Sequence, residues 1–482
     1  MTVEQFSPPP EPSLFNRRDV LRVGSISFAG SLLGSVASQT EAAHKRNVRA
    51  NGKAKQVLFL WMGGGVTHLD SFDPKPLAPE TIRGTLSPLA TALPGVQFNE
   101  PMPNLARIAN DICLVRSFSH DSNDHLLSQV YTLSGRKVNR SELFKHPNIG
   151  SIFSYLFGPR NGLPGYIAVP GITRPGPPPH NLFVGGWLGS QYAPFAVGGQ
   201  PDQPDFTKGP NPLHPNPFME EELKPKALEL SDGLTTTRLQ RRSSLRQILE
   251  DAARAAESQA PTEGIDGHYE AAMNMLTSPR VRGAFDLSQE SAKVRDEYGR
   301  TKIGSRCLQA RRLIEAGARF VMVDYGYDPD YGNLWDQHNA SSQKFPHTSK
   351  MCMRPYHLAG IDKSFAALIS DLKMRGLLDS TLVVFLTEFG RTPKINKNGG
   401  RDHWGACGSI FFTGGGVKTG QVIGASDKQG GYPITKGYGP ADIAATIYRA
   451  VGLEPDHHYL RDIQDRPWQL LDHGRAIDGV LG

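Results

Sequence analysis

The chain has 482 residues, of which 38% are hydrophobic, and a formal net charge of +6. This hydrophobic content excludes a disordered chain. A modest positive charge without any block of Lys and Arg argues against a nucleic-acid-binding protein. Length and composition favour one large soluble α/β domain with insertions over three small domains. The positive charge also favours an anionic substrate or matrix.

The N-terminus carries the pattern of an export signal. Arg17 and Arg18 precede a short apolar run that ends in small residues at Ser35, Val36 and Ala37. The run is too short to span a bilayer as a mature helix, and it resembles a twin-arginine signal peptide. We therefore expect residues 1–37 to be removed after passage through the twin-arginine translocation machinery. Residues 38–55 are then a linker, and the mature chain is periplasmic or at the cell surface, without a stable membrane span.

The first predicted strand, Gln56 to Met62, runs into three glycines and then a polar stretch. A strand that ends in glycines lets its backbone approach a ligand closely and exposes amides to an anion. Thr67 is a candidate nucleophile, since a hydroxyl needs a base or a metal beside it. Asp70 and Asp73 are candidate metal ligands.

A second strand is predicted at Ile112 to Ser117, and two histidines, His120 and His125, follow it. Histidines five residues apart do not share one face of a helix, so a loop or a helix start is expected, where both rings reach a cleft. Either is a candidate catalytic base. Asn148 to Phe157 is then predicted to be an amphipathic helix.

The middle of the chain changes character twice. Residues 158–217 are rich in Pro and Gly and predict an insertion of extended connections and turns, which shapes a cleft or serves as surface padding. Residues 238–318 predict a helical segment, with Gly317 as its C-cap. This segment opens with an apolar stripe of Leu245, Ile248, Leu249 and Ala252.

A third strand is predicted at Arg319 to Asp324, and the loop after it contains Asp336 and His338. Apolar residues at a spacing of three and four from Leu358 to Leu372 predict the next helix, which ends before Gly376.

The strand Thr381 to Leu386 is entirely apolar or β-branched, as expected of a strand buried on both faces. The loop after it contains Glu388, Arg391, Asp402 and His403. A strand at Ser409 to Phe412 and a helix around Asp442 to Val451 complete the pattern.

Strands that alternate with helices at these distances predict a mostly parallel sheet covered by helices on both faces. The carboxyl ends of parallel strands share one edge, so the acidic and histidine residues after them are expected to converge. Taken singly, each histidine is better explained as a surface or core residue. Carboxylate and imidazole donors together suit a divalent ion such as zinc or manganese, with calcium also left open. The expected metal ligands are Asp70, Asp73, Asp336, His338, Glu388, Asp402 and His403.

Five motifs carry a resemblance to a known family: GGGVTHLDSFDPKP, the H-x4-H after the second strand, WDQHN, TEFGRTP and GRDHW. They resemble the domain of unknown function 1501 family, placed by similarity in the alkaline phosphatase and sulfatase superfamily. The resemblance implies a three-layer sandwich over residues 56–482 and a metal-dependent ester hydrolase ancestry. It also implies that Asp336, His338 and His403 match metal ligands and that Thr67 lies near the nucleophile position.

Three departures from the superfamily pattern matter for function. Glycines replace the acid expected at the end of the first strand, and Phe389 replaces an expected histidine. No C-x-P-x-R motif is present, so the formylglycine of sulfatases is not available.

We therefore expect an exported metal-dependent hydrolase of a sulfate or phosphate ester, in which Arg391 pairs with the anionic oxygens of the substrate. The alternative is a non-catalytic descendant that binds a sulfated or phosphorylated polysaccharide or cell-surface component. A site that works without metal, with His120 or His125 as general base, is the third possibility. For the four cysteines, buried free thiols are the default, and the spacing assigns no disulfide.

Overall fold

The computed structural model describes residues 51–171, 182–197, 220–221, 223, 275–328, 330–339, 343, 345–462 and 464–482. Its centre is an eight-stranded sheet with the order β14-β4-β13-β10-β1-β7-β5-β6. The strands are β1 (Gln56–Trp61), β4 (Cys113–Phe118), β5 (Tyr166–Val169), β6 (Phe195–Ala196), β7 (Phe320–Asp324), β10 (Thr381–Leu386), β13 (Gly408–Thr413) and β14 (Gln421–Ile423).

One strand of this sheet runs against the others. β13 pairs antiparallel with both β10 and β4, whereas the remaining neighbours pair parallel. The amino end of β13 therefore lies at the same edge as the carboxyl ends of β1, β4, β7 and β10. Residues that precede β13 consequently join those that follow the other strands.

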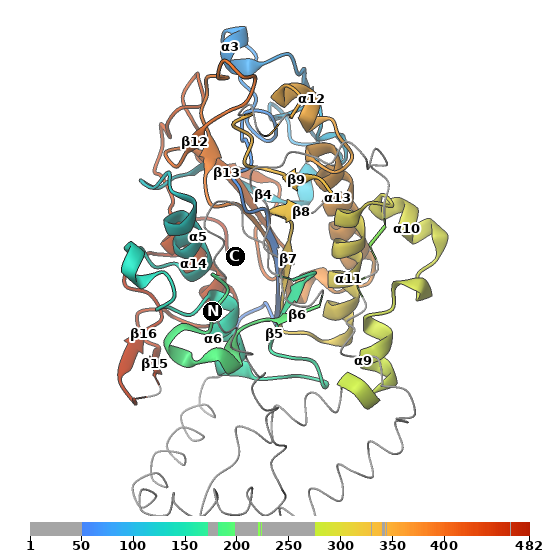
Figure 1. The fold of residues 1–482 in the computed structure, drawn as a ribbon, viewed down its shortest axis with the longest axis vertical. Coiled ribbons are helices and arrows are strands. Elements are labelled where there is room, and N and C mark those ends of the chain that lie inside the picture. Colours follow the sequence, from blue (N-terminus) through green and yellow to red (C-terminus); the bar gives the residue numbers. More distant parts are fainter. Residues whose placement is uncertain are drawn as a thin grey trace, which may run out of the picture.

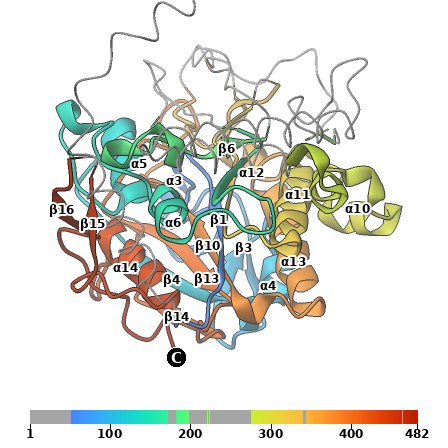
Figure 2. The same ribbon diagram turned by 90° about the horizontal axis from the view of Figure 1, so that it is seen from below.

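Helices cover both faces of the sheet, so the predicted three-layer α/β sandwich with a mostly parallel sheet is confirmed (Figures 1 and 2). One face carries α5 (His125–Ser134), α6 (Ile149–Phe157) and α14 (Pro440–Ala450). The other carries α4 (Pro103–Arg107), α9 (Pro279–Ala284), α10 (Ala292–Tyr298), α11 (Lys302–Ala316) and α13 (Leu358–Met374).

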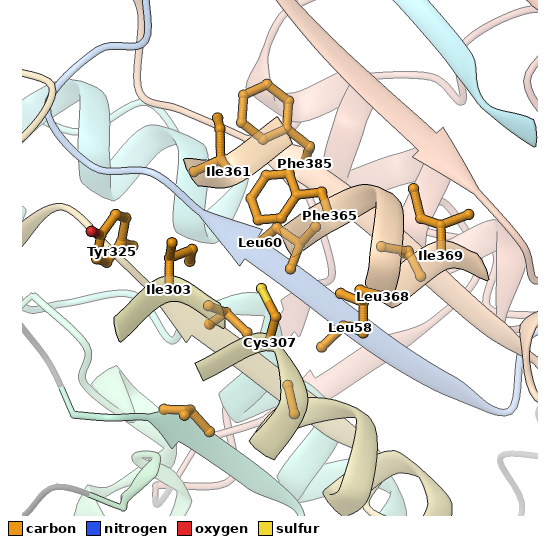
Figure 3. Close-up of a cluster of buried hydrophobic side chains, with 14 of the residues drawn as sticks. Leu58, Leu60, Ile303, Cys307, Tyr325, Ile361, Phe365, Leu368, Ile369 and Phe385 are labelled. Atoms are coloured by element: carbon orange, nitrogen blue, oxygen red, sulfur yellow. The ribbon is translucent and has the colours of Figure 1, made fainter. Parts of the chain in front are cut away.

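The central strands are apolar throughout because both of their faces are buried. Successive side chains of a strand point to opposite faces. Leu58 and Leu60 of β1 therefore pack against α11 and α13, where Figure 3 shows them beside Cys307 and Phe365. Phe59, between them in sequence, packs in the cluster under α6 and α14.

The helix ends follow local sequence signals. The Thr301 side chain accepts a hydrogen bond from the Gly304 amide and starts α11, and the helix ends at Gly317, which has a φ of 104°. This left-handed conformation favours glycine, and the predicted C-cap is confirmed. Gly299 ends α10 in the same way, so residues 279–316 form three helices rather than one continuous helical segment.

The remaining helices and strands are short and lie outside the main sheet. The short helices are α3 (Glu80–Arg83) and α12 (Thr348–Cys352). The two-stranded pairs are β2 (Pro88–Ala90) with β3 (Gln97–Asn99), β8 (Tyr327–Asp328) with β9 (Gly332–Asn333), β11 (Gly390–Arg391) with β12 (His403–Trp404), and β15 (Tyr459–Arg461) with β16 (Pro467–Gln469). The 3₁₀ helices are Ala109–Asp111, Arg140–Glu142, Gly186–Leu188, Ser190–Tyr192, Leu287–Gln289 and Leu378–Ser380.

The segment 158–217, interpreted from its composition as an insertion, contributes two strands to the main sheet. β5 pairs with β7 and β6 pairs with β5. The four-residue run of β5 is buried, but it is too short to stand out among the surrounding prolines and glycines. The rest of this segment falls partly on residues 172–181 and 198–217, outside the described residues.

Some segments interpreted from the sequence are not among the described residues. The signal peptide, most of the linker and the apolar stripe of the segment 238–257 lie outside the described residues. None of the helices in the described ranges has the length and apolarity needed to cross a bilayer. All four cysteines are buried and free.

Asp362 of α13 holds the start of α4. Its carboxylate accepts hydrogen bonds from the amides of Asn104 (2.9 Å) and Leu105 (2.7 Å). The residue at the N-cap of α4, Met102, makes no side-chain hydrogen bond, so the cap comes from another helix. Asp362→Ala is expected to lower the free energy of unfolding by about 1–3 kcal/mol, because a buried amide loses its acceptor. Urea denaturation measures this loss. Asp379→Ala, at an exposed position, is the control and should change stability by no more than about 0.5 kcal/mol.

Candidate metal centre

The candidate site lies at the carboxyl edge of the central sheet, where the crevice of an open α/β sheet is expected. Three connections supply it. His125 begins α5, the helix after β4. Asp336 and His338 follow β9, Glu388 follows β10, and His403 belongs to β12, just before the antiparallel strand β13. Residues from three distant parts of the chain thus meet because the sheet strand before or after each of them reaches the same edge.

Three imidazoles surround the carboxylate of Asp336. The Nε2 atom of His125 lies 3.2 Å from Oδ2, and the Nε2 atoms of His338 and His403 lie 3.1 and 3.0 Å from Oδ1. The donor atoms of His125, Asp336 and His403 all lie within 4.8 Å of one another. Their side chains are mostly buried, with exposed fractions of 11% for His125 and Asp336 and 20% for His403.

Each imidazole has its other nitrogen committed to an acceptor. Nδ1 of His125 lies 2.7 Å from Oε1 of Glu388, and Nδ1 of His338 lies 2.8 Å from Oδ1 of Asp402. Nδ1 of His403 lies 2.8 Å from the backbone carbonyl of Asn123. A carbonyl or an ionised carboxylate accepts only, so the network assigns a proton to each Nδ1.

This assignment turns the Nε2 atoms toward the centre of the cluster. His403, with its proton on Nδ1, presents an unprotonated Nε2 to Asp336, and this Nε2 lies only 2.8 Å from Nε2 of His338. Nε2 of His125 is buried and faces Oδ2 of Asp336 at 3.2 Å. Electron pairs that face one another at these distances repel unless a cation or a proton lies between them. The cluster therefore has the polarity of a cation site.

The residues present fit a transition-metal ion. Zinc binds histidine nitrogens at about 2.0–2.1 Å in a tetrahedron, which places neighbouring donors roughly 3.3 Å apart. The distances to Asp336 given above are close to this value. Three imidazoles and one carboxylate suit zinc or manganese, whereas calcium takes oxygen ligands, so this donor set does not fit the calcium left open by the sequence. Histidine ligands also characteristically donate their second nitrogen to a carboxylate or carbonyl, as all three do here.

The charges around the site follow from burial and from the contacts above. Burial alone would raise the pKa of Asp336, but His125 and Arg391 hold it well below its usual range. Burial opposes protonation of His125, yet Asp336 and Glu388 outweigh it and raise the pKa of His125 to about 9. A proton therefore sits on its Nε2, facing Asp336, and a bound metal ion would replace that proton. Burial and the positive charge of Arg391 lower the pKa of His403 to about 4. His403 is therefore a neutral donor across the physiological range.

Two of the predicted ligands lie behind the imidazoles instead of facing the centre. Glu388 is fully buried and orients His125, and it is held in turn by the Gly64 amide at 2.6 Å and by Nε2 of Gln129 at 3.2 Å. Asp402 orients His338 and accepts a second hydrogen bond from Nδ2 of Asn396 at 3.1 Å. His125, predicted as a catalytic base, lies instead among the donors.

Glu388→Gln is expected to weaken metal binding about 10–100-fold, because an amide orients the His125 ring less well than a carboxylate. Metal affinity by competition with a chelator measures the change. Glu315→Gln, on the exposed side of α11, is the matched control and should leave the affinity unaltered. An unchanged affinity in Glu388→Gln would show that Glu388 has no part in positioning the ring.

Arg391 is buried against the cluster, and most of its N–H groups are already occupied. It donates to the carbonyls of Gly64, Gly65 (3.0 Å) and Arg401 (3.1 Å), and to Oδ1 of Asp336 (2.9 Å). Its side chain is 2% exposed. The structure thus places Arg391 behind Asp336, as the fixed counter-charge of that carboxylate.

The two acids after the first strand form separate ion pairs. Asp70 is fully buried and makes two 2.8 Å hydrogen bonds to Arg401, and it also accepts from the hydroxyl of Thr67 at 3.0 Å. Asp73 pairs with Lys75 at 3.0 Å and Arg116 at 3.4 Å. Neither acid therefore joins the imidazole cluster, because nearby Arg and Lys side chains form ion pairs with both.

His120 supports the site from outside. Its Nε2 lies 2.5 Å from the backbone carbonyl of Glu388, and its Nδ1 accepts from the Ser122 amide at 3.2 Å. Three other supporting residues carry no signal that sequence reasoning used. Asn123, Gln129 and Asn396 are polar amides, a residue type common on any surface, and only their contacts identify them.

Comparisons with known proteins place these features in context. A family model described as protein of unknown function (DUF1501) matches residues 54–481. No curated protein matches the sequence.

Among solved structures, the chain is similar to PsFucS1 sulfatase from Pseudoalteromonas sp., with 15% identity, a TM-score of 0.36, and coverage of 92% of this chain and 74% of that one. It is also similar to phosphonate monoester hydrolase SpPMH from Silicibacter pomeroyi, with 12% identity, a TM-score of 0.38, and coverage of 88% and 76%. Similarity of this degree says nothing about the activity of this chain.

Proposed function

Because the chain belongs to the DUF1501 family of proteins of unknown function, its activity has to be argued from its own residues, and we propose that it is a metal-dependent hydrolase of an anionic ester. One observation carries the proposal. Three imidazoles with committed Nδ1 atoms turn their Nε2 atoms toward one carboxylate at the carboxyl edge of the sheet. A phosphate or sulfate ester is the proposed substrate class.

His125, Asp336 and His403 would hold the ion, with His338 beside them. A divalent ion held there supplies Lewis acidity toward an ester oxygen and makes water more acidic. The protein's own contribution is to fix the donors. Glu388, Asp402 and the Asn123 carbonyl set the orientation of the three rings, and Arg391 balances the charge of Asp336.

Phe389 closes the inner side of the site. It is fully buried, and its ring centroid lies 5.1 Å from that of His125 and 4.6 Å from that of His403. An apolar wall at this position keeps water away from the inner face of the donors. Water and substrate then reach the ion from the side of His338 and Asp402, whose side chains are 31% and 53% exposed.

Water is the proposed nucleophile. The hydroxyl of Thr67, the candidate from the sequence, donates to Asp70 and is buried with it. In the proposed reaction the oxygen of water bonds to phosphorus or sulfur, and the bond to the ester oxygen breaks. The alcohol leaves with one proton of water. The second proton stays on the released phosphate or, for a sulfate ester, goes to solvent.

The alternative function is binding of a sulfated or phosphorylated polysaccharide without turnover. One observation favours it: Arg391 and Thr67, the two residues expected to engage a substrate, are both committed inside the protein. The leader predicted at residues 1–37 makes the periplasm or cell surface the proposed location for either function. Fractionation of cells that produce wild type and Arg17→Lys, Arg18→Lys protein tests the location, and equal export of both would contradict it.

The test of the proposed function starts with metal content. Elemental mass spectrometry on untagged wild-type protein is expected to find one zinc or manganese ion per chain. Hydrolysis of 4-nitrophenyl phosphate and 4-nitrophenyl sulfate is then followed before and after chelation, and after the ion is restored. Turnover that disappears with the chelator and returns with the ion supports the hydrolase. Retention on a sulfated polysaccharide column without turnover of either ester would favour the binding protein.

A further inference from the structure

The three imidazoles of the metal centre are not equally well anchored. His125 is anchored by Glu388, a fully buried carboxylate that also accepts hydrogen bonds from the Gly64 amide and from Nε2 of Gln129. His403 is anchored by the backbone carbonyl of Asn123, an exposed residue in a loop that two hydrogen bonds, of 2.8 and 2.6 Å, join to Gly405. The ring of His403 packs against both of the others, with centroids 4.3 Å from that of His125 and 4.4 Å from that of His338.

His338 is anchored at the surface instead. Its acceptor, Asp402, has a side chain that is 53% exposed, and His338 itself is 31% exposed. Hydrogen bonds and ion pairs at exposed positions are weak, because water competes for both partners. Of the three rings, His338 is thus the most exposed, and its acceptor is an exposed side chain in place of a buried carboxylate or a backbone carbonyl.

The other donors form a complete set without His338. The atoms of His125, Asp336 and His403 make up the compact group of possible ligands within the described residues, and His338 stands outside that group. Its Nε2 nevertheless lies 2.8 Å from Nε2 of His403 and 3.1 Å from Asp336, within reach of the same ion. Metal sites with four protein ligands are mostly structural, whereas catalytic sites have three protein ligands and keep a position for water or substrate. With His338 bound, an ion here would have the four protein ligands of a structural site. Without it, the ion would have the three protein ligands and the open position of a catalytic site.

We propose that His338 is an exchangeable ligand. It completes the coordination of the ion in the resting protein, and it gives up its position to an oxygen of a tetrahedral oxyanion such as phosphate or sulfate. In this exchange the metal–nitrogen bond to His338 breaks and a metal–oxygen bond forms, without any covalent change in the protein. Asp402 keeps the displaced ring close to the site. The inference rests on the proposed function, since it requires a bound ion.

Variants loaded with cobalt(II) distinguish a fixed histidine ligand from an exchangeable one, because the visible absorption of cobalt(II) depends on its ligands. His403→Ala removes a donor of the compact group and should abolish stoichiometric binding. His338→Ala should still bind one ion per chain, with an affinity reduced no more than about tenfold. Inorganic phosphate should then bind to cobalt-loaded His338→Ala roughly tenfold more tightly than to wild type, because no ligand has to leave. Asp402→Ala, which frees the ring, should shift phosphate affinity in the same direction by a smaller factor.

The outcomes are distinct. Loss of the ion from His338→Ala to the same extent as from His403→Ala would make His338 a fixed ligand and overturn the inference, while the proposed metal site would stand. Phosphate binding that is unchanged or weaker in His338→Ala would also overturn it. Thermal unfolding of the metal-free variants identifies any change caused by misfolding, and His457→Ala, at an exposed position, is the control histidine. If wild type binds no ion, the proposed function fails and the inference falls with it.

Discussion

Replacing His403 by alanine is expected to abolish stoichiometric metal binding and, with it, ester hydrolysis. His403 is one of three residues whose donor atoms lie within 4.8 Å of one another, and its neutral Nε2 faces Asp336 at 3.0 Å. Loss of a residue that only orients a ligand costs about 10–100-fold in metal affinity or activity, so loss of the ligand itself should cost more. Metal content by elemental mass spectrometry and turnover of 4-nitrophenyl esters measure the two effects on the same sample.

The control for this prediction is His457→Ala, which removes an exposed histidine far along the sequence from the cluster. It should match wild type in both measurements. Circular dichroism of metal-free His403→Ala separates loss of the ion from loss of the fold. A variant that is folded, binds one ion and hydrolyses ester at the wild-type rate would remove His403 from the site. Metal content lost with turnover retained would instead favour a reaction that needs no metal.

Replacing Arg401 by methionine is expected to lower the free energy of unfolding by about 3–5 kcal/mol, because the buried carboxylate of Asp70 loses its partner. Two hydrogen bonds of 2.8 Å join the pair, and the exposed fractions of the side chains are 1% and 0%. Burial alone would raise the pKa of Asp70, but the charge of Arg401 lowers it below its ordinary value. The ion pair therefore stabilises the fold at pH values above the ordinary pKa of an aspartate. This stabilisation is lost as the pH falls through the lowered pKa of Asp70.

Urea denaturation at pH 7 measures the loss. The double variant Asp70→Asn, Arg401→Met should recover part of it, since it leaves no unpaired charge inside. Lys436→Met is the matched control, because it breaks a 3.0 Å ion pair between Lys436 and Asp478, whose side chains are 61% and 77% exposed, respectively. It should lower the free energy of unfolding by no more than about 1 kcal/mol. Equal effects of the buried and the exposed substitution would show that the Asp70–Arg401 pair does not stabilise the fold.

The strands and the edge at which the site lies were accessible from the sequence. The runs at Gln56–Trp61 and Thr381–Leu386 are apolar at every position but the first, because both faces of the sheet are buried, and this signal is local. The same holds for the helix that ends at Gly317. The rule that parallel strands present their carboxyl ends at one edge then indicated that the acidic and histidine residues after the strands converge. Asp336, His338 and His403 do so, whereas Asp70 and Asp73 form ion pairs elsewhere.

The direction of β13 and the strands β5 and β6 were not accessible in this way. A strand reads the same whether it pairs parallel or antiparallel, since its side chains alternate in either case. Only the neighbours of β13 decide its direction, and one of them, β4, lies far away in the sequence. The position of β12 beside the other site residues depends on that direction.

What the sequence determined by itself is the set of residue types available at the carboxyl edge of the sheet, because burial and turn signals are properties of short stretches. The tertiary structure decided which of them pair with one another. Glu388 meets His125 across 263 residues and Asp70 meets Arg401 across 331, so no local pattern separates a carboxylate behind an imidazole from one in a structural ion pair. A carboxylate's role follows from the nearest cation or N–H group, and the fold alone places those groups.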